Sequence, residues 1–194
     1  MSLLLILLLA YLVGSFPTGV FISKRKYGLD VREVGSGNIG ATNITRIFGW
    51  YAGVLVFLID FAKGAVPLVL FKRIYPEDPW CWCIAAFFLV LGHCFSVFLG
   101  FKGGKGVATS LGCILVVEPF CAFLYGGVYL ISLKLSKISA VGSLTGVLSC
   151  LLYLIFKWPG SASGTLILSL CGLIILRHHE NIQRLKSGWI KKRQ

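Results

Sequence analysis

The sequence predicts an all-α, polytopic integral membrane protein that forms a single domain over residues 1–194. Hydrophobic residues make up 57% of the chain and charged residues only 13%, whereas a soluble domain carries about 25% charged residues. Several apolar stretches are close to the roughly 20 residues that a helix needs to cross a bilayer. Polar loops separate these stretches, and together they predict seven transmembrane helices, with the N-terminus outside and the C-terminus in the cytoplasm.

The first predicted helix covers residues 3–22. No charged residue precedes it, and Lys24-Arg25-Lys26 follow it. A cleaved signal peptide has a basic start and a shorter apolar region, so we expect a retained helix whose N-terminus lies outside. The segment Gly14-Ser15-Phe16-Pro17-Thr18-Gly19 within it combines small residues with a proline, which is typical of a packing kink or of a part of the site, and we favour the kink.

The second predicted helix runs from about residue 44 to 71, after a glycine-rich loop. Thr42 and Asn43 are both good N-cap residues, and the helix is expected to begin at one of them. Asp60 and Lys63 lie three residues apart and so share one face. Charges near the bilayer centre are costly and normally face the protein interior in pairs. We therefore expect an internal ion pair that orients the helices.

Five further helices are predicted from the later apolar stretches. One of them is too short to cross easily and ends before Glu118-Pro119, so we expect it to form a hairpin with the next helix. Trp158-Pro159-Gly160 marks an outer turn. The five predicted ranges are 80–100, 107–117, 120–134, 139–156 and 162–177.

The distribution of positive charge supports this topology. Of the nineteen Lys and Arg residues, fifteen lie on the predicted inner side, three lie on the outer side, and Lys63 lies within a helix. Inner loops of membrane proteins carry such an excess. Part of the net charge of +12 is therefore a consequence of topology and says nothing about the substrate.

The seven cysteines show no spacing typical of a metal site and mostly lie inside apolar runs. We interpret them as small hydrophobic core residues. The close pair Cys81 and Cys83 is not expected to form a disulfide.

The stretch Gly35-Ser36-Gly37-Asn38-Ile39-Gly40-Ala41-Thr42-Asn43 has the composition of an anion-binding loop. Its glycines and asparagines allow backbone angles that turn several N–H groups toward one point. Arg46 follows about one turn into the next helix. A phosphate site typically combines a loop rich in N–H donors, the positive end of a helix and a guanidinium group, and all three are expected here. A flexible loop with a capped helix is the alternative interpretation.

A second glycine-rich basic stretch is Phe101-Lys102-Gly103-Gly104-Lys105-Gly106-Val107-Ala108-Thr109. It is not a Walker A loop, because Lys105 is followed by glycine rather than Ser or Thr. Its glycines still let the backbone and an ammonium group approach a phosphate. The alternative interpretation is a tight turn whose lysines only reflect the positive-inside rule. Near the C-terminus, His178 and Asn181 lie on one helix face. All of these polar groups are predicted at the cytoplasmic surface.

These segments resemble the bacterial acyl-phosphate:glycerol-3-phosphate acyltransferases, the PlsY family. The resemblance rests on the two glycine-rich stretches, on the segment from 14 to 19, on Asp60-Phe61-Ala62-Lys63-Gly64, and on Arg177-His178 with Asn181-Ile182 and Arg184-Leu185. It covers nearly the whole chain. It implies a seven-helix acyltransferase of the bacterial inner membrane, with its active site at the cytoplasmic face. The enzyme would move a fatty acyl group from acyl phosphate to the 1-hydroxyl of glycerol 3-phosphate, giving lysophosphatidate and phosphate in phospholipid biosynthesis.

The resemblance also implies a binding site for acyl phosphate. Its residues belong to the first glycine-rich stretch and would supply backbone and side-chain donors. They are Ser36, Gly37 and Asn38, with Thr42 and Asn43 nearby.

For glycerol 3-phosphate, the resemblance implies that Arg46 and Lys105 hold the phosphate group. Ser143, His178 and Asn181 would bind and orient the glycerol part and so form the catalytic set. The proton of the attacking hydroxyl can go to His178 or to the leaving phosphate, and we favour the phosphate. No metal or cofactor is implied. The expected partners are the two substrates and the lipid bilayer, and the protein is expected to be a monomer.

Two other function classes share some of these features. A transporter of an organic phosphate would also have seven helices and phosphate loops, but it would need polar groups at the midplane and usually an internal repeat. Only Asp60 and Lys63 lie deep, and no convincing repeat is present. A nucleic-acid binder would carry a basic stripe with stacking aromatics, whereas the positive charge here is spread over short loops.

Overall fold

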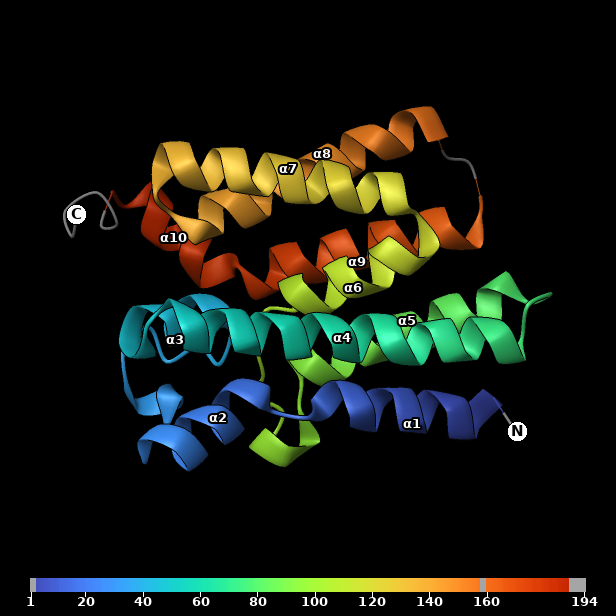
Figure 1. Cartoon of the computed structure of the whole chain (residues 1–194). Coiled ribbons are helices and arrows are strands. Elements are labelled where there is room, and N and C mark those ends of the chain that lie inside the picture. Colours follow the sequence, from blue (N-terminus) through green and yellow to red (C-terminus); the bar gives the residue numbers. More distant parts are fainter. Residues whose placement is uncertain (1–2, 158–159, 189–194) are drawn as a thin grey trace.

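The computed structural model describes residues 3–157 and 160–188. In this part of the chain all regular secondary structure is helical. The helices pack side by side with their axes roughly aligned (Figure 1). In chain order they are α1 (Leu3–Ser15), α2 (Thr18–Tyr27), η1 (Val31–Glu33), α3 (Ala41–Phe48), α4 (Trp50–Ile74), α5 (Pro79–Cys94), η2 (Val97–Leu99), α6 (Val107–Val117), α7 (Pro119–Ser136), α8 (Ser139–Lys157), α9 (Ala162–Arg177) and α10 (His179–Lys186).

Five segments of the described chain are long and apolar enough to cross a membrane, with α1 and α2 counted as one segment. A sixth is formed if α9 and α10, which are bent by 56° relative to each other, are taken together. The helix α6 is apolar but shorter. The expected polytopic all-α membrane fold is therefore confirmed, whereas the number of seven crossings and the orientation of the termini stay predictions.

The first predicted helix is in fact two helices. The prediction of one helix over 3–22 was wrong because α1 ends at Ser15 and α2 begins at Thr18. Proline lacks a backbone N–H and cannot continue the helical ladder. At this break, the carbonyl oxygen of Phe16 accepts a hydrogen bond of 2.9 Å from Nζ of Lys63. The predicted kink is thus a break in the helical hydrogen bonds at which α1 and α2 still count as one membrane segment, and α4 supplies a donor to the freed carbonyl oxygen.

The expected ion pair between Asp60 and Lys63 is confirmed. Nζ of Lys63 lies 2.8 Å from Oδ1 of Asp60, and both side chains are buried. The hydroxyl of Thr18 donates to the same carboxylate at 2.8 Å. Because the partners come from α2 and from the α1–α2 break, this pair fixes α4 against the broken segment and compensates buried charges that would otherwise be costly.

The second predicted helix is also divided. Gly49, with a φ of +87°, separates α3 from α4, so the prediction of one helix over 44–71 was wrong. The predicted N-cap was wrong too, because α3 begins at Ala41 with Gly40 in the N-cap position. The side chain of Asn43 is turned away to bond the preceding loop.

The later helices begin and end close to the predicted residues, with one exception. The range 80–100 was too long, since α5 ends at Cys94 and residues 95–106 form a loop with the short helix η2. The predicted hairpin of α6 and α7 is present, with Pro119 as the first residue of α7. Residues 158–159 of the predicted outer turn lie outside the described residues.

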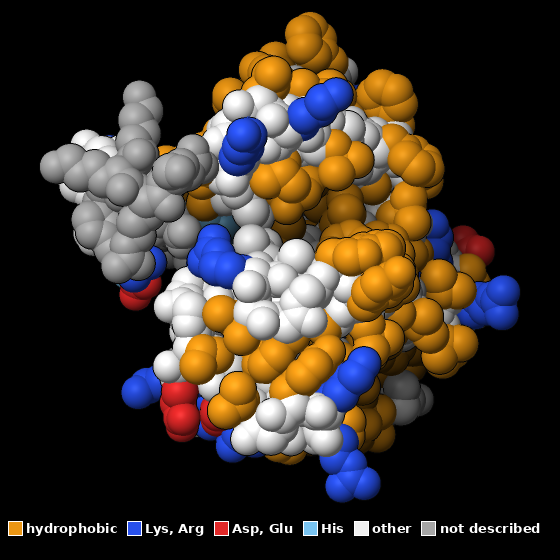
Figure 2. Space-filling view, turned by 60° about the vertical axis from the view of Figure 1, so that its left-hand side comes forward, with side chains coloured by type: hydrophobic (Ala, Val, Ile, Leu, Met, Phe, Trp, Pro, Cys, Tyr) orange, Lys and Arg blue, Asp and Glu red, His pale blue; other side chains and the backbone are white. Residues whose placement is uncertain are grey.

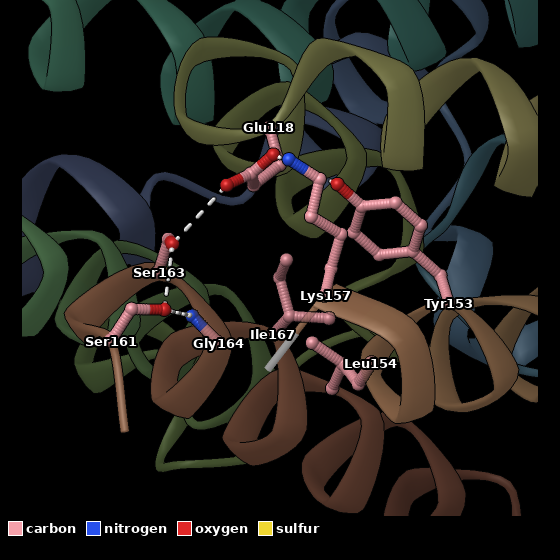
Figure 3. A pocket seen from close by; sticks show the side chains of 8 residues that line it. All are labelled: Glu118, Tyr153, Leu154, Lys157, Ser161, Ser163, Gly164 and Ile167. Atoms are coloured by element: carbon pink, nitrogen blue, oxygen red, sulfur yellow. Dashed lines mark hydrogen bonds between the residues drawn. The ribbon is translucent and has the colours of Figure 1, made fainter. Parts of the chain in front are cut away.

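Packing joins helices that are distant in the sequence, since α1 packs against α5 and α4 against α6. The consecutive helices α7 and α8 also pack against each other. All seven cysteines belong to the described residues and are buried free thiols, as expected. Beside the α6–α7 turn, Glu118 accepts hydrogen bonds from Tyr153 on α8 at 3.1 Å and from Ser163 on α9 at 3.3 Å (Figure 3). The pocket there is only about 10 Å³ in volume, so we assign it a structural role.

The opposite end of the bundle carries the first glycine-rich stretch and the motif around Asn181. It contains the loops between α2 and α4, the α7–α8 turn and α10, and it lies on the left of Figure 1. We call it the basic end. Figure 2 brings this side forward and shows Lys and Arg side chains dispersed among apolar ones.

Candidate active site

The first glycine-rich loop is organised by the buried side chain of Asn43. Its Oδ1 accepts a hydrogen bond of 2.9 Å from the backbone N–H of Ser36. Its Nδ2 donates to the carbonyl oxygens of Val34 and Val31 at 3.2 and 3.4 Å. The loop turns at Gly37, whose φ of +70° favours glycine. Asn43 therefore shapes the loop from beneath, and its amide is already occupied.

The other predicted acyl-phosphate residues lie on the outside of this loop. Ser36 is exposed, and Gly37 and Asn38 are half-buried. Oδ1 of Asn38 accepts the backbone N–H of Gly40 at 2.8 Å. The hydroxyl of Thr42 lies 3.0 Å from that of Ser139, at the start of α8. The first loop thus meets α8 at the basic end.

The second glycine-rich loop is held from two sides. The backbone N–H groups of Gly103 and Gly104 donate to the carbonyl oxygens of Cys94 and His93 at 3.1 and 3.0 Å. On the other side, the guanidinium of Arg177 donates to the carbonyl oxygens of Gly103 at 2.9 Å and of Gly104 at 3.0 Å. Neither position has room for a side chain, since a Cβ on Gly104 would overlap the His93 ring. The loop therefore has one tightly defined path.

This path brings Lys105 to α10. Its Nζ donates a hydrogen bond to Oδ1 of Asn181, so two predicted site residues that are 76 positions apart in the sequence are in contact. Burial lowers the pKa of Lys105 to about 8; Glu180 opposes this shift, and Arg184, Arg177 and Arg46 add to it. A cation that is desolvated and surrounded by other cations favours an anionic ligand.

His178 lies at the bend between α9 and α10 and is almost fully buried. Its Nδ1 is 2.8 Å from the carbonyl oxygen of Ile174. A carbonyl oxygen only accepts, so Nδ1 carries the hydrogen. Burial lowers the pKa of His178 to about 4, with Lys105 and Arg177 contributing. The ring is therefore neutral at pH 7, and Nε2 is left as a hydrogen-bond acceptor.

Ser143 and Arg46 complete the predicted set. Ser143 is buried in α8, and its hydroxyl donates to the carbonyl oxygen of Ser139 at 3.1 Å, one turn earlier. Arg46 is exposed on α3, close enough to Lys105 to act on its pKa. Lys105 thus contacts Asn181, and Arg46 and His178 lie within electrostatic range of Lys105. Ser143 lies on a separate helix, α8. The substrate roles of all these residues stay predictions.

Arg177 is the residue whose role sequence reasoning missed. It was quoted within a motif, but its clamp on Gly103 and Gly104 depends on a loop more than 70 residues away. Among the described residues, no group of three or more His, Cys, Asp or Glu residues could hold a metal ion.

The chain is similar to known proteins over nearly its whole length. Residues 4–188 match the family model described as glycerol-3-phosphate acyltransferase. A glycerol-3-phosphate acyltransferase of Anaeromyxobacter sp. (strain K) is 45% identical, with 94% of this chain and 92% of that protein covered. One of Aquifex aeolicus (strain VF5) is 42% identical, with 97% of each covered.

Solved structures with a similar fold belong to the same kind of protein. The crystal structure of PlsY (YgiH), an integral membrane glycerol 3-phosphate acyltransferase, in its glycerol 3-phosphate form superposes with a TM-score of 0.90 at 41% identity, over 97% of this chain and 94% of that one. Its lysophosphatidic acid form gives a TM-score of 0.89 at 40% identity, over 97% and 93% of the two chains. The match over nearly the full length, in sequence and in fold, shows that this chain belongs to the glycerol-3-phosphate acyltransferase family.

Proposed function

We propose that this protein is an acyltransferase that moves a fatty acyl group from acyl phosphate to the 1-hydroxyl of glycerol 3-phosphate. The products are lysophosphatidate and inorganic phosphate. The single observation that carries this proposal is the contact between Lys105 and Asn181 beside the neutral His178, in a member of this family. Lys105 is a cation that can bind a phosphate group, and the side chains of Asn181 and His178 can form hydrogen bonds with hydroxyl groups.

Glycerol 3-phosphate is bound at this contact. Lys105 and Arg46 hold its phosphate group, because both are cationic and Arg46 is near enough to lower the pKa of Lys105. Asn181 and His178 take the glycerol hydroxyls, and Ser143 supports this part from α8. A bound phosphate also satisfies Lys105 better than the neutral amide that it contacts in the free protein.

Acyl phosphate is bound at the first glycine-rich loop. Ser36, Gly37 and Asn38 line its exposed side and offer backbone N–H groups and short polar side chains. Asn43 keeps this loop in shape, and Thr42 borders it toward α8. The acyl chain reaches the loop from the bilayer, since apolar side chains adjoin the basic end (Figure 2).

Acyl transfer needs no protein base in this arrangement. The hydroxyl oxygen attacks the carbonyl carbon of acyl phosphate, and the bond between that carbon and the bridging oxygen breaks. Acyl phosphate is a dianion near neutral pH, because phosphoester groups have a second pKa of about 6. The leaving phosphate takes the bridging oxygen with it and accepts the hydroxyl proton, and it departs as the hydrogen-phosphate dianion. His178, with Nε2 as an acceptor, orients the hydroxyl.

The proposed setting is the bacterial inner membrane, with seven crossings, the N-terminus outside and the basic end in the cytoplasm. This orientation follows from the excess of Lys and Arg at the basic end. It gives a cytosolic substrate direct access to Lys105 and Arg46.

The experiment is a donor comparison with the purified protein. Acyl phosphate and labelled glycerol 3-phosphate should yield labelled lysophosphatidate, whereas acyl-CoA or acyl carrier protein as sole donor should yield none. Turnover with acyl-CoA would refute the donor assignment. Failure with every donor would refute the enzymatic function itself.

A further inference from the structure

A groove of about 530 Å³ lies on the surface formed by the α1–α2 break, η1 and η2. Its apolar walls are partly exposed and include two phenylalanines that belong to distant segments, Phe21 on α2 and Phe98 on η2. Its volume is within the range of small-molecule sites in proteins. The lining residues are Phe16, Pro17, Val20, Phe21, Lys24, Arg25, Arg32, Phe98 and Leu99.

One end of this groove is positively charged. Asp30 pairs with Lys24 at 3.0 Å and with Arg32 at 2.7 Å. Arg32 holds the pKa of Asp30 well below its usual range, so the carboxylate stays charged. Lys24, Arg25 and Arg32 carry three positive charges against two negative charges, those of Asp30 and of Glu33, which acts electrostatically on Arg32, so an excess of one positive charge remains. Asp30 also fixes two of the three cations in place.

The helix α2, which forms one wall of the groove, is about as long as one leaflet of a bilayer is thick. The helix α2 has 10 residues, which span about 15 Å at 1.5 Å per residue, or half of a hydrocarbon core of about 30 Å. Phe16 and Pro17 lie just before the first residue of α2, and Lys24 and Arg25 lie in its last turns. An amphiphile with an anionic head would therefore place its chain along the phenylalanines and its head beside the cations.

The groove shares no residue with the proposed active site. The proposed substrate residues lie on the two glycine-rich loops, α3, α8 and α9–α10, whereas the groove is formed by α1, α2, η1 and η2. The two regions are nevertheless joined by short stretches of chain. Arg32 lies four residues before Ser36, and Leu99 lies six residues before Lys105.

We propose that this groove is a binding site for an anionic phospholipid of the surrounding leaflet, with the acyl chain against Phe16, Phe21 and Phe98 and the phosphate beside Arg25. The occupant is a membrane lipid rather than free phosphate, because most of the lining is apolar and only one end is charged. Because the walls continue into both glycine-rich loops, occupancy stabilises the folded protein.

The test uses the full chain purified in a nonionic detergent, with the melting temperature Tm followed during lipid titration. Phosphatidylglycerol should raise Tm saturably, whereas phosphatidylcholine with the same chains and inorganic phosphate should not. Each basic residue near an anionic head contributes about 1 kcal/mol, which is about fivefold in affinity. Arg25→Gln should therefore weaken the apparent Kd about fivefold, and Lys24→Gln with Arg25→Gln about 25-fold.

Two control variants distinguish binding in this groove from a general effect of surface charge and from binding in the proposed active site. Arg73→Gln removes the same charge from an exposed position in the last turn of α4, at the opposite end of the bundle, and should leave the titration unchanged. Lys105→Ala removes a cation of the proposed active site and should also keep the shift. The proposal is overturned if phosphatidylcholine acts like phosphatidylglycerol, if Arg73→Gln weakens binding as much as Arg25→Gln does, or if Lys105→Ala abolishes the shift.

Discussion

Arg177 should be required for the second glycine-rich loop to reach its working conformation. Its guanidinium makes two hydrogen bonds to loop carbonyls, at 2.9 and 3.0 Å, and stacks on the Phe95 ring at 5.1 Å. A hydrogen bond from a charged donor is worth about 1.5–3 kcal/mol. Arg177 is only half-buried, so the lower value applies. For Arg177→Gln we expect a total loss of about 2–3 kcal/mol, or about 30- to 150-fold in kcat/KM.

The assay compares steady-state acyl transfer at varied glycerol 3-phosphate for the wild type, Arg177→Gln and Arg177→Lys. The lysine variant keeps the charge but cannot bridge two carbonyl oxygens with a planar fork, so it should recover less than half of the lost free energy. Lys134→Gln, an exposed charge on α7, is the matched control and should behave as the wild type. If Arg177→Gln kept kcat/KM within threefold of the wild type, or if Arg177→Lys restored it fully, the clamp would not position the loop.

The other predictions concern the phosphate site, the proton and the topology. Lys105→Ala and Arg46→Ala should each raise KM for glycerol 3-phosphate about 10- to 100-fold, since each removes a charged contact worth about 1.5–3 kcal/mol; an unchanged KM would exclude that residue from the site. Because Lys105 loses its proton above a pKa of about 8, KM should rise between pH 8 and 9.5 in the wild type but stay flat in Lys105→Arg. His178→Asn at saturating substrate should lose less than 100-fold in kcat, whereas a loss of three decades with a rate that then rises with pH would make His178 the general base. A cysteine introduced at Glu77 should be labelled from outside intact cells and one at Ser187 should not, and the opposite pattern would invert the proposed topology.

The positions of many helices can be predicted from the sequence, because an apolar run and the Gly or Pro residues at its ends determine a helix from neighbouring residues alone. The short helix α6 and its turn at Pro119 are examples. The break at Phe16 is different, because its stability depends on Lys63, which is 47 residues away. A local signal predicts that proline disturbs a helix but not how far the helix opens.

In the candidate site, too, contacts between distant residues could not be predicted from local sequence signals. Asn43 has the intrinsic preference of a helix cap, but the loop that it folds competes for its amide and takes it. Lys105 and Asn181 were singled out from separate motifs, whereas their contact follows from the way Arg177 holds Gly103 and Gly104 against α9. Motifs therefore propose candidate residues, and tertiary packing determines which of these candidates are in contact.

The measurement that tests the central claim most directly follows one oxygen atom. Glycerol 3-phosphate labelled with ¹⁸O in its 1-hydroxyl is incubated with the purified protein and unlabelled acyl phosphate, and the products are analysed by mass spectrometry. Attack of this hydroxyl on the acyl carbon predicts that the label is retained in the ester oxygen of lysophosphatidate and that the released phosphate is unlabelled. A doubly phosphorylated glycerol with free fatty acid, or the absence of any new ester, would contradict acyl transfer from acyl phosphate.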